Sequence, residues 1–150
     1  MNKVHIRKAN KSDYPMIKEL VKELYATLDV KDGMDELLRR DKFEDILDDP
    51  KIEVLVAELN GLVIGYLTLN INKALLDSGS TAIIDELIVT NKYHGKGIGK
   101  KLVIAAIKTC KGLGCSEVGV GTEFSNQKAI KFYKDCGFTE IGVIFEKILK

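Results

Sequence analysis

The sequence is poor in cysteine and histidine, and this scarcity excludes several classes of protein. Cys110, Cys115 and Cys136 are odd in number and lack the paired spacing of metal ligands, so they indicate neither a disulfide framework nor a zinc site. We expect free thiols in a reducing cytosol. His5 and His94 add no convincing cluster, and no metal is expected.

Charge imbalance and long apolar runs are also missing. The 150 residues carry 23 lysines and arginines against 22 acids, which favours neither nucleic acid nor an anionic membrane as a partner. No apolar run is long enough to cross a bilayer, and no segment near residue 1 resembles a signal peptide. We therefore expect a cytoplasmic protein with a single domain over residues 1–150.

Periodicity in the first half of the chain predicts strands and helices in alternation. Ser12 and Pro15 are suited to the start of a helix. Asn60-Gly61 is the strongest short signal for a hairpin turn. The expected strands cover residues 3–9, 52–59 and 62–71, and the expected helical faces cover 17–28 and 37–47.

The second half continues the alternation. Residues 82–89 are apolar along most of their length, as in a strand covered on both faces. Ser125 or Asn126 is expected to cap a later helix, which Gly137 ends. Further elements are a helix from 98 to 110, a strand over 117–122, and closing strands from 138 and over 143–149. The order predicts a mixed sheet with helices on its faces.

A glycine-rich loop lies between the strand at 82–89 and the helix that follows. Its glycines at 95, 97 and 99 match neither the Walker A nor the Rossmann spacing. A loop of this kind exposes backbone N–H groups beside the positive end of a helix, and glycine lets an anion approach closely. The pattern therefore predicts a site for a phosphate or pyrophosphate, with an unliganded tight turn as the alternative.

Two motifs resemble the GNAT superfamily of N-acetyltransferases. The family's pyrophosphate motif runs Arg/Gln-x-x-Gly-x-Gly/Ala, and residues 94–99 follow it with His94 in the first position. The family's second motif is Asn-x-x-Ala-x-x-Phe-Tyr-x-x-x-Gly-Phe. This chain matches it at Asn126, Ala129, Phe132, Tyr133, Gly137 and Phe138.

This resemblance implies an α/β (α+β) fold with a mixed, mostly antiparallel sheet of six to seven strands and about four helices. It also implies acetyl-CoA as donor and a primary amine as acceptor. Leu87, Ile88 and Val89 would bind the pantetheine arm through their main chain, and Asn126 would contact the cofactor. The pyrophosphate would lie against His94, Gly95, Lys96, Gly97, Ile98, Gly99 and Lys100.

Acetyl transfer to an amine requires a donor to the oxyanion, a proton for the leaving thiolate and a base for the amine. A backbone N–H of Ile88 or Val89 is the expected oxyanion donor, and Tyr133 the expected general acid. Asp85 and Glu86 are the candidate bases. Strand alternation directs them to opposite faces unless a bulge intervenes, and Glu86 is favoured. Glu123 is a third candidate.

The sequence does not identify the amine that accepts the acetyl group. Residues 29–49 hold nine acids against four basic residues, so an acidic rim could attract a polyamine, an aminoglycoside or a peptide amine. A solvated helical face explains the same charges. The favoured hypothesis is an N-acetyltransferase that works by direct attack in a ternary complex. The alternatives are a non-catalytic acyl-CoA-binding or sensing module and a transferase of longer acyl groups, and a homodimer is possible.

Overall fold

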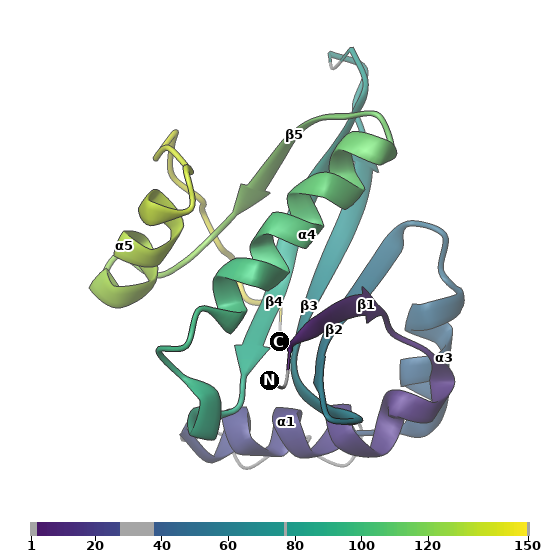
Figure 1. Cartoon of the computed structure of the whole chain (residues 1–150). Coiled ribbons are helices and arrows are strands. Elements are labelled where there is room, and N and C mark those ends of the chain that lie inside the picture. The colour runs from purple at the N-terminus through teal and green to yellow at the C-terminus, as the bar shows by residue number, and fades with distance from the viewer. Residues whose placement is uncertain (1–2, 28–37, 77, 150) are drawn as a thin grey trace.

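The computed structural model describes residues 3–27, 38–76 and 78–149 (Figure 1). The first half comprises β1 (His5–Lys8), a short 3-10 turn, α1 (Tyr14–Thr27), α3 (Arg40–Asp48), β2 (Ile52–Leu59) and β3 (Leu62–Lys73). The second half comprises β4 (Ser80–Val89), a second 3-10 turn, α4 (Ile98–Gly112), β5 (Cys115–Val120) and α5 (Gln127–Asp135).

The strands form one mixed sheet in the order β1-β2-β3-β4-β5. The first three pairings are antiparallel and β4 pairs with β5 in parallel, which confirms the expected fold class. The described residues contain five strands rather than six or seven. The predicted closing strands after residue 138 are wrong, because residues 138–149 have no strand partner within the described chain.

Helices cover both faces of the sheet, and each face has its own core. On one face, Leu102 and Val103 of α4 pack with Leu67 and Leu69 of β3, all fully buried. On the other, α1 packs against Val56, Tyr66 and Ile88 through Ile17 and Leu20. Figure 1 shows α4 lying across one face and α1 running below the strands. Because both faces are covered, β3 is apolar along most of its length.

The turn between β2 and β3 confirms the hairpin prediction. Asn60 and Gly61 have φ values of 52° and 79°. A two-residue turn with positive φ at both positions matches the twist of the flanking strands, and asparagine and glycine adopt it most readily. The local sequence therefore determines the register next to the turn, at Leu59–Leu62 and Glu58–Val63, and a bulge between Ala57 and Glu58 shifts the register of the remaining pairs.

The start of α1 differs from the prediction that Ser12 caps the helix. Asn10 instead caps the 3-10 turn at Lys11–Asp13 that leads into α1. Its side chain accepts from the Ser12 N–H at 3.0 Å, while Asp13 accepts from the Asn10 N–H at 2.8 Å. Asp13 is 1% exposed and also pairs with Arg7 at 2.8 Å. Arg7 in turn bonds Glu58 of β2 at 2.7 Å. This network joins β1 and β2 to the beginning of α1.

We expect Asp13→Asn to destabilise the protein by about 2–4 kcal/mol, because it removes a charge-assisted pair and leaves the guanidinium partly uncompensated. Burial raises the pKa of Asp13, but the hydrogen bonds from Arg7 and Asn10 outweigh it and hold the pKa below its usual value. The stabilisation is therefore complete near neutral pH and is lost as the pH falls through the lowered pKa.

Urea unfolding of wild type and variant between pH 7 and pH 2 measures both effects. The control is Asp48→Asn, since Asp48 pairs with Lys11 on the surface at 3.4 Å, and it should cost less than about 1 kcal/mol. Equal losses in the two variants would contradict the assignment of Asp13 as the key carboxylate.

Candidate active site

The edge of β4 that faces β5 is open over its second half. The pairing of β4 with β5 ends at Ile84 and Val120, and Figure 1 shows β5 diverging from β4 beyond that point. Residues 87–89 remain paired to β3 on their other edge. Their side chains pack in the two cores, so only main-chain groups are presented to the gap.

Hydrogen bonding to β3 shows which of these main-chain groups are free. The Thr90 N–H donates to the Ile64 carbonyl at 2.9 Å. In an antiparallel pair, the backbone N–H and C=O groups of successive residues point alternately toward and away from the partner strand. The groups of Ile88 therefore also point toward β3, whereas those of Leu87 and Val89 point to the open edge. The Val89 carbonyl lies 2.5 Å from His94 Nε2, as expected for a carbonyl that points away from β3.

The glycine-rich loop lies directly after this edge and opens α4. Gly95 and Gly97 have φ values of 73° and 78°, a conformation that favours glycine. Gly97 is the N-cap of α4 and has no side chain to cap it. The first helical bond runs from the Lys101 N–H to the Gly97 carbonyl, so the amides of residues 98–100 have no intrahelical acceptor. Such amides are a typical anion site.

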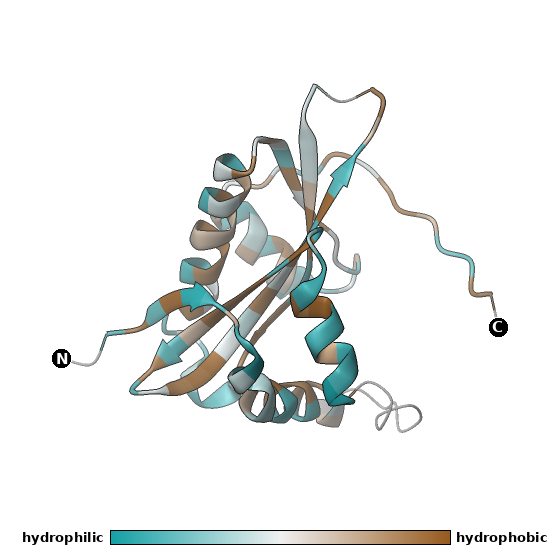
Figure 2. Cartoon of the chain, turned by 90° about the vertical axis from the view of Figure 1, so that its right-hand side faces the viewer, coloured by the Kyte–Doolittle hydropathy of each residue, from teal (hydrophilic) through white to brown (hydrophobic). Residues whose placement is uncertain are grey.

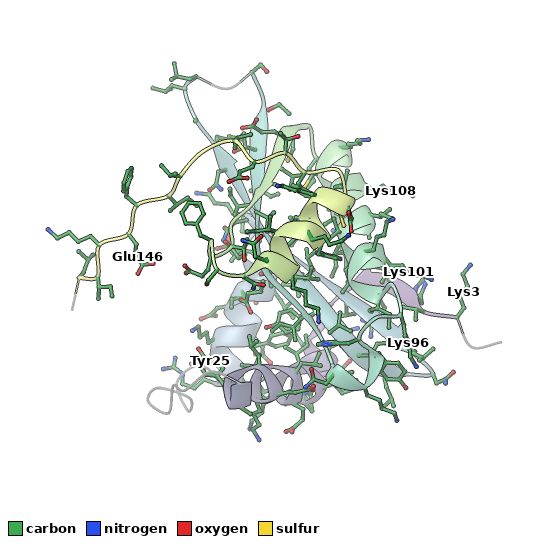
Figure 3. The ribbon with its side chains drawn as sticks, turned by 90° about the vertical axis from the view of Figure 1, so that its left-hand side faces the viewer. Lys3, Tyr25, Lys96, Lys101, Lys108 and Glu146 are labelled. Carbon is green, nitrogen blue, oxygen red and sulfur yellow. The ribbon has the colours of Figure 1, made fainter. Side chains whose placement is uncertain are left out.

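Lysine side chains surround the loop. Lys92 and Lys96 lie over the Tyr93 ring, 5.7 Å and 5.3 Å from its centroid. Figure 3 shows Lys96 on the loop and Lys101 on α4, on the same side of the molecule. The cations add positive potential to the helix N-terminus, where an anion and not a cation is favourable.

Two side chains hold the loop in place. His94 stands where the family motif has arginine or glutamine, and its ring is bound to the Val89 carbonyl. Glu23 of α1 accepts from the Asn91 N–H at 2.7 Å and from the Thr90 hydroxyl at 2.8 Å. Glu23 was not predicted, because it precedes the loop by 67 residues and belongs to no motif.

The second motif packs against the first. A Cβ atom on Gly99 would lie 3.4 Å from the Phe132 ring, so α5 approaches the first turn of α4 closely. Asn126 caps α5 by accepting from the Ala129 N–H at 3.0 Å, which confirms it as the cap. The structure therefore places Asn126 and Tyr133 on the helix that adjoins the glycine-rich loop.

Tyr133 is half-buried in an aromatic cluster. Its ring meets Phe132 and Phe138 edge-on, with centroids 5.1 Å and 5.7 Å apart. Burial, followed by the nearby Cys136, raises the pKa of the Tyr133 phenol above its ordinary value. Tyr133 is therefore protonated at neutral pH, as a proton donor must be.

A cavity of about 310 Å³ lies between α1, α3 and the sheet. The sheet contributes Tyr66, Thr68 and Glu86, and the Tyr66 hydroxyl donates to Glu86 at 2.5 Å. The Thr68 hydroxyl is buried and has no partner among the described residues. The helices and the segment before α3 contribute Tyr14, Ile17, Lys18, Val21, Leu24, Tyr25, Leu38, Arg39, Lys42, Phe43 and Ile46.

A bulge places both candidate bases on the same face of the sheet. Thr68 pairs with Glu86, and the next residue of β3, Leu69, pairs with Ile84, so Asp85 is the extra residue. Glu86 bonds Tyr66, and Asp85 accepts from Asn70 at 2.6 Å.

Tyr66 and Asn70 share one face of β3 because they are four residues apart. The prediction of opposite faces is therefore wrong at this position. Both carboxylates are exposed, but Glu86 lines the cavity and Asp85 does not. The third candidate, Glu123, is also exposed and does not line the cavity.

The acids predicted to form a rim do not line this cavity within the described residues. Asp41 pairs with Arg39, and Glu44 with Arg40. The acids at 29–36 lie outside the described residues. The cations Lys18, Arg39 and Lys42 do line the cavity. Among the described residues, the charged groups that line this cavity are therefore mostly cationic rather than acidic, with Glu86 as the one carboxylate.

No group of metal ligands occurs among the described residues. The three cysteines are free, with Cys110 buried and the other two half-buried. No helix in the described part of the chain is long and apolar enough to cross a membrane.

We expect Glu23→Gln to loosen the loop, because a carboxylate accepts both hydrogen bonds more strongly than an amide. The Asn91 amide should exchange with solvent roughly tenfold faster. The Asn91 N–H and the Thr90 hydroxyl lower the pKa of Glu23, so the anchor holds at neutral pH and is lost as the pH falls through that lowered pKa.

Hydrogen exchange read by NMR measures this effect. The control is Glu19→Gln, one turn earlier on α1, where the carboxylate pairs only with Lys22 among the interactions described. Unchanged exchange at Asn91 in Glu23→Gln would exclude Glu23 as the anchor.

Comparisons with known proteins identify the family of this chain. The model of the acetyltransferase (GNAT) family matches residues 15–138. Glucosamine 6-phosphate N-acetyltransferase of Arabidopsis thaliana is 31% identical over 133 residues, 86% of this chain and 85% of that protein. Aminoalkylphosphonate N-acetyltransferase of Salmonella typhimurium is 27% identical over 144 residues, 96% of this chain and 90% of that protein.

A solved structure shares the fold. The aminoglycoside N-acetyltransferase AAC(6′)-Iy, in complex with CoA, superposes with a TM-score of 0.84 at 23% identity, over 100% of this chain and 97% of its own. The matched region holds the glycine-rich loop, the open edge of β4 and the Asn126–Phe138 motif. The chain is a member of the GNAT family of acetyltransferases.

Proposed function

We propose that this protein transfers the acetyl group of acetyl-CoA to a primary amine. The main support is that the unpaired edge of β4 is followed in the chain by the N-terminus of α4, which has no side-chain cap. The pantetheine arm contains amides that suit a strand edge, and the pyrophosphate suits the amides of residues 98–100. The likeness in fold to a protein crystallised with CoA supports this assignment.

In this proposal acetyl-CoA supplies the thioester, and the side chains and main chain of the protein supply charge stabilisation and proton transfer. The Val89 N–H points to the open edge and donates to the oxyanion as it develops. Val89 is preferred to Ile88 as the donor, because the backbone N–H of Ile88 points toward β3. Leu87 offers the remaining main-chain groups to the pantetheine arm.

The acceptor amine enters the cavity next to Glu86 and Thr68. An alkyl ammonium has a pKa near ~10.4, so Glu86, directly or through water, takes its proton before attack. The new C–N bond forms as the C–S bond breaks. The Tyr133 hydroxyl gives its proton to the leaving thiolate, and the phenolate recovers a proton through water from the nitrogen as the amide forms. Asp85 lies outside the cavity and accepts a hydrogen bond from the Asn70 side chain.

We also propose that the acceptor carries an anionic group besides its amine. Glu86 supplies one negative charge on the sheet side, while Lys18 and Lys42 line the helix side and have no carboxylate partner among the described residues. An amine near Glu86 and a phosphate near the lysines would satisfy both charges. The names of the two curated relatives support this class, because glucosamine 6-phosphate and aminoalkylphosphonates contain both groups.

An assay of thiol release from acetyl-CoA tests the function and the acceptor class together. The panel pairs glucosamine 6-phosphate with glucosamine and adds a polyamine, an aminoglycoside and a peptide amine. We expect the phosphorylated amine to have the higher kcat/KM, and Lys42→Gln to lower that value about tenfold with little effect on glucosamine.

The exposed Lys51, which lies outside this cavity, provides the control variant Lys51→Gln. A preference for polyamines would contradict the acceptor class but leave the acetyltransferase function intact. CoA binding without thiol release for any amine would instead favour a non-catalytic acyl-CoA-binding module. Faster turnover of longer acyl-CoA donors would identify a different acyl preference.

For Tyr133→Phe we expect kcat to fall by about 10²–10⁴ with little change in KM, because the variant keeps the ring and loses only the proton donor. The raised pKa of Tyr133 means that the phenol stays protonated across the neutral range, so its own ionisation should limit kcat only above the usual tyrosine pKa.

Steady-state kinetics from pH 6 to pH 10 measure the loss of kcat, and a wild-type kcat that does not fall within this range fits the raised pKa of Tyr133. Tyr93→Phe is the matched control, since the Tyr93 ring lies under two lysines on the loop and has no proposed part in proton transfer. A Tyr133→Phe variant with unchanged kcat at every pH would rule out Tyr133 as the general acid.

A further inference from the structure

A side chain of the protein itself occupies part of the open edge of β4. His94 Nε2 lies 2.5 Å from the carbonyl oxygen of Val89, the last residue of the strand. A carbonyl oxygen can only accept a hydrogen bond, so this ring nitrogen carries the proton and donates. Within the described residues, the imidazole ring makes no other hydrogen bond.

No strand covers this edge in the described part of the chain. The pairing of β5 with β4 ends at Ile84, and residues 138–149 form no strand. Figure 2 shows the chain beyond α5 extending away from the body of the protein. Proteins usually cover or blunt an unpaired strand edge. The His94 ring therefore satisfies a carbonyl that no neighbouring strand pairs with.

The ring also lies between the two parts of the proposed donor site. The amides of residues 98–100 at the start of α4 are the proposed pyrophosphate site, and the pantetheine arm would run from there to the main chain of Leu87 and Val89. His94 belongs to the loop, and its ring reaches back to Val89. The side chain thus spans the stretch that the arm has to follow.

The ring can leave this position while the loop keeps its shape. His94 is exposed and belongs to neither core. The loop is held independently by main-chain bonds from the Tyr93 N–H to the Thr90 carbonyl at 2.9 Å and from the His94 N–H to the Asn91 carbonyl at 3.2 Å. Glu23 adds its two hydrogen bonds to Thr90 and Asn91. Displacing the imidazole therefore costs one hydrogen bond.

We propose, on the basis of the proposed acetyl-CoA function, that His94 is a gate on the donor site. Its ring closes the Val89 carbonyl in the free protein and turns away when CoA binds. A pantetheine amide then replaces the imidazole as the donor to this carbonyl. Because the protein must give up one hydrogen bond before the arm can bind, the gate weakens the apparent affinity for CoA by about twofold to tenfold.

Calorimetric titration of His94→Ala with two probes tests the gate. CoA carries the pantetheine arm, whereas 3′-phospho-ADP carries the same pyrophosphate without the arm. We expect the variant to bind CoA about twofold to tenfold more tightly than wild type, and 3′-phospho-ADP equally well, because only the arm competes with the ring. His5→Ala is the matched control, since His5 is exposed on β1 at the far edge of the sheet, and it should bind both probes as wild type does.

Other results of this titration would contradict the gate in different ways. Equal or weaker CoA binding by His94→Ala, with unchanged 3′-phospho-ADP binding, would mean that the ring is neutral or orients the carbonyl for the arm. An equal change for both probes would mean that the ring acts only through the loop. Either result would overturn the gate and leave the acetyltransferase proposal intact. If wild type and variant both failed to bind CoA, the proposed function and the gate would fall together.

Crystal structures of the free protein and of its CoA complex show the ring directly. We expect the bond between His94 Nε2 and the Val89 carbonyl oxygen in the free protein, and a separation of more than about 3.5 Å in the complex. A His94 ring that keeps this bond with CoA in place would exclude the gate.

Discussion

The site depends on the point at which β5 leaves β4. Parallel pairing holds the two strands together only as far as Ile84 and Val120, and beyond that point the edge of β4 has no strand partner on this side among the described residues. The glycine-rich loop follows the same strand, so the amides at the start of α4 continue the line of donors. A longer ladder between β4 and β5 would occupy the groups on which the proposed donor site relies.

A second constraint is the bulge at Asp85. One extra residue in β4 brings Glu86 beside Tyr66 and into the cavity, while Asp85 is left outside on Asn70. The bulge thus selects one of two adjacent carboxylates for the acceptor side. The bulge lies on β4, which also forms the proposed acetyl-CoA edge, so one strand positions both the proposed donor site and the proposed acceptor site.

Local chemistry made much of this protein predictable from its sequence. Asn60-Gly61 implies a hairpin, Gly95 and Gly97 adopt a conformation that favours glycine, and Asn126 caps the helix that it precedes. The two motifs identified the family because their residues are close together in the chain.

The tertiary structure alone decided the bulge at Asp85, the Glu23 anchor and the cations of the cavity. It also decided that residues 138–149 have no strand partner among the described residues. These features depend on strand register and on contacts between residues far apart in sequence, and neither is set by the conformational preferences of a few neighbouring residues.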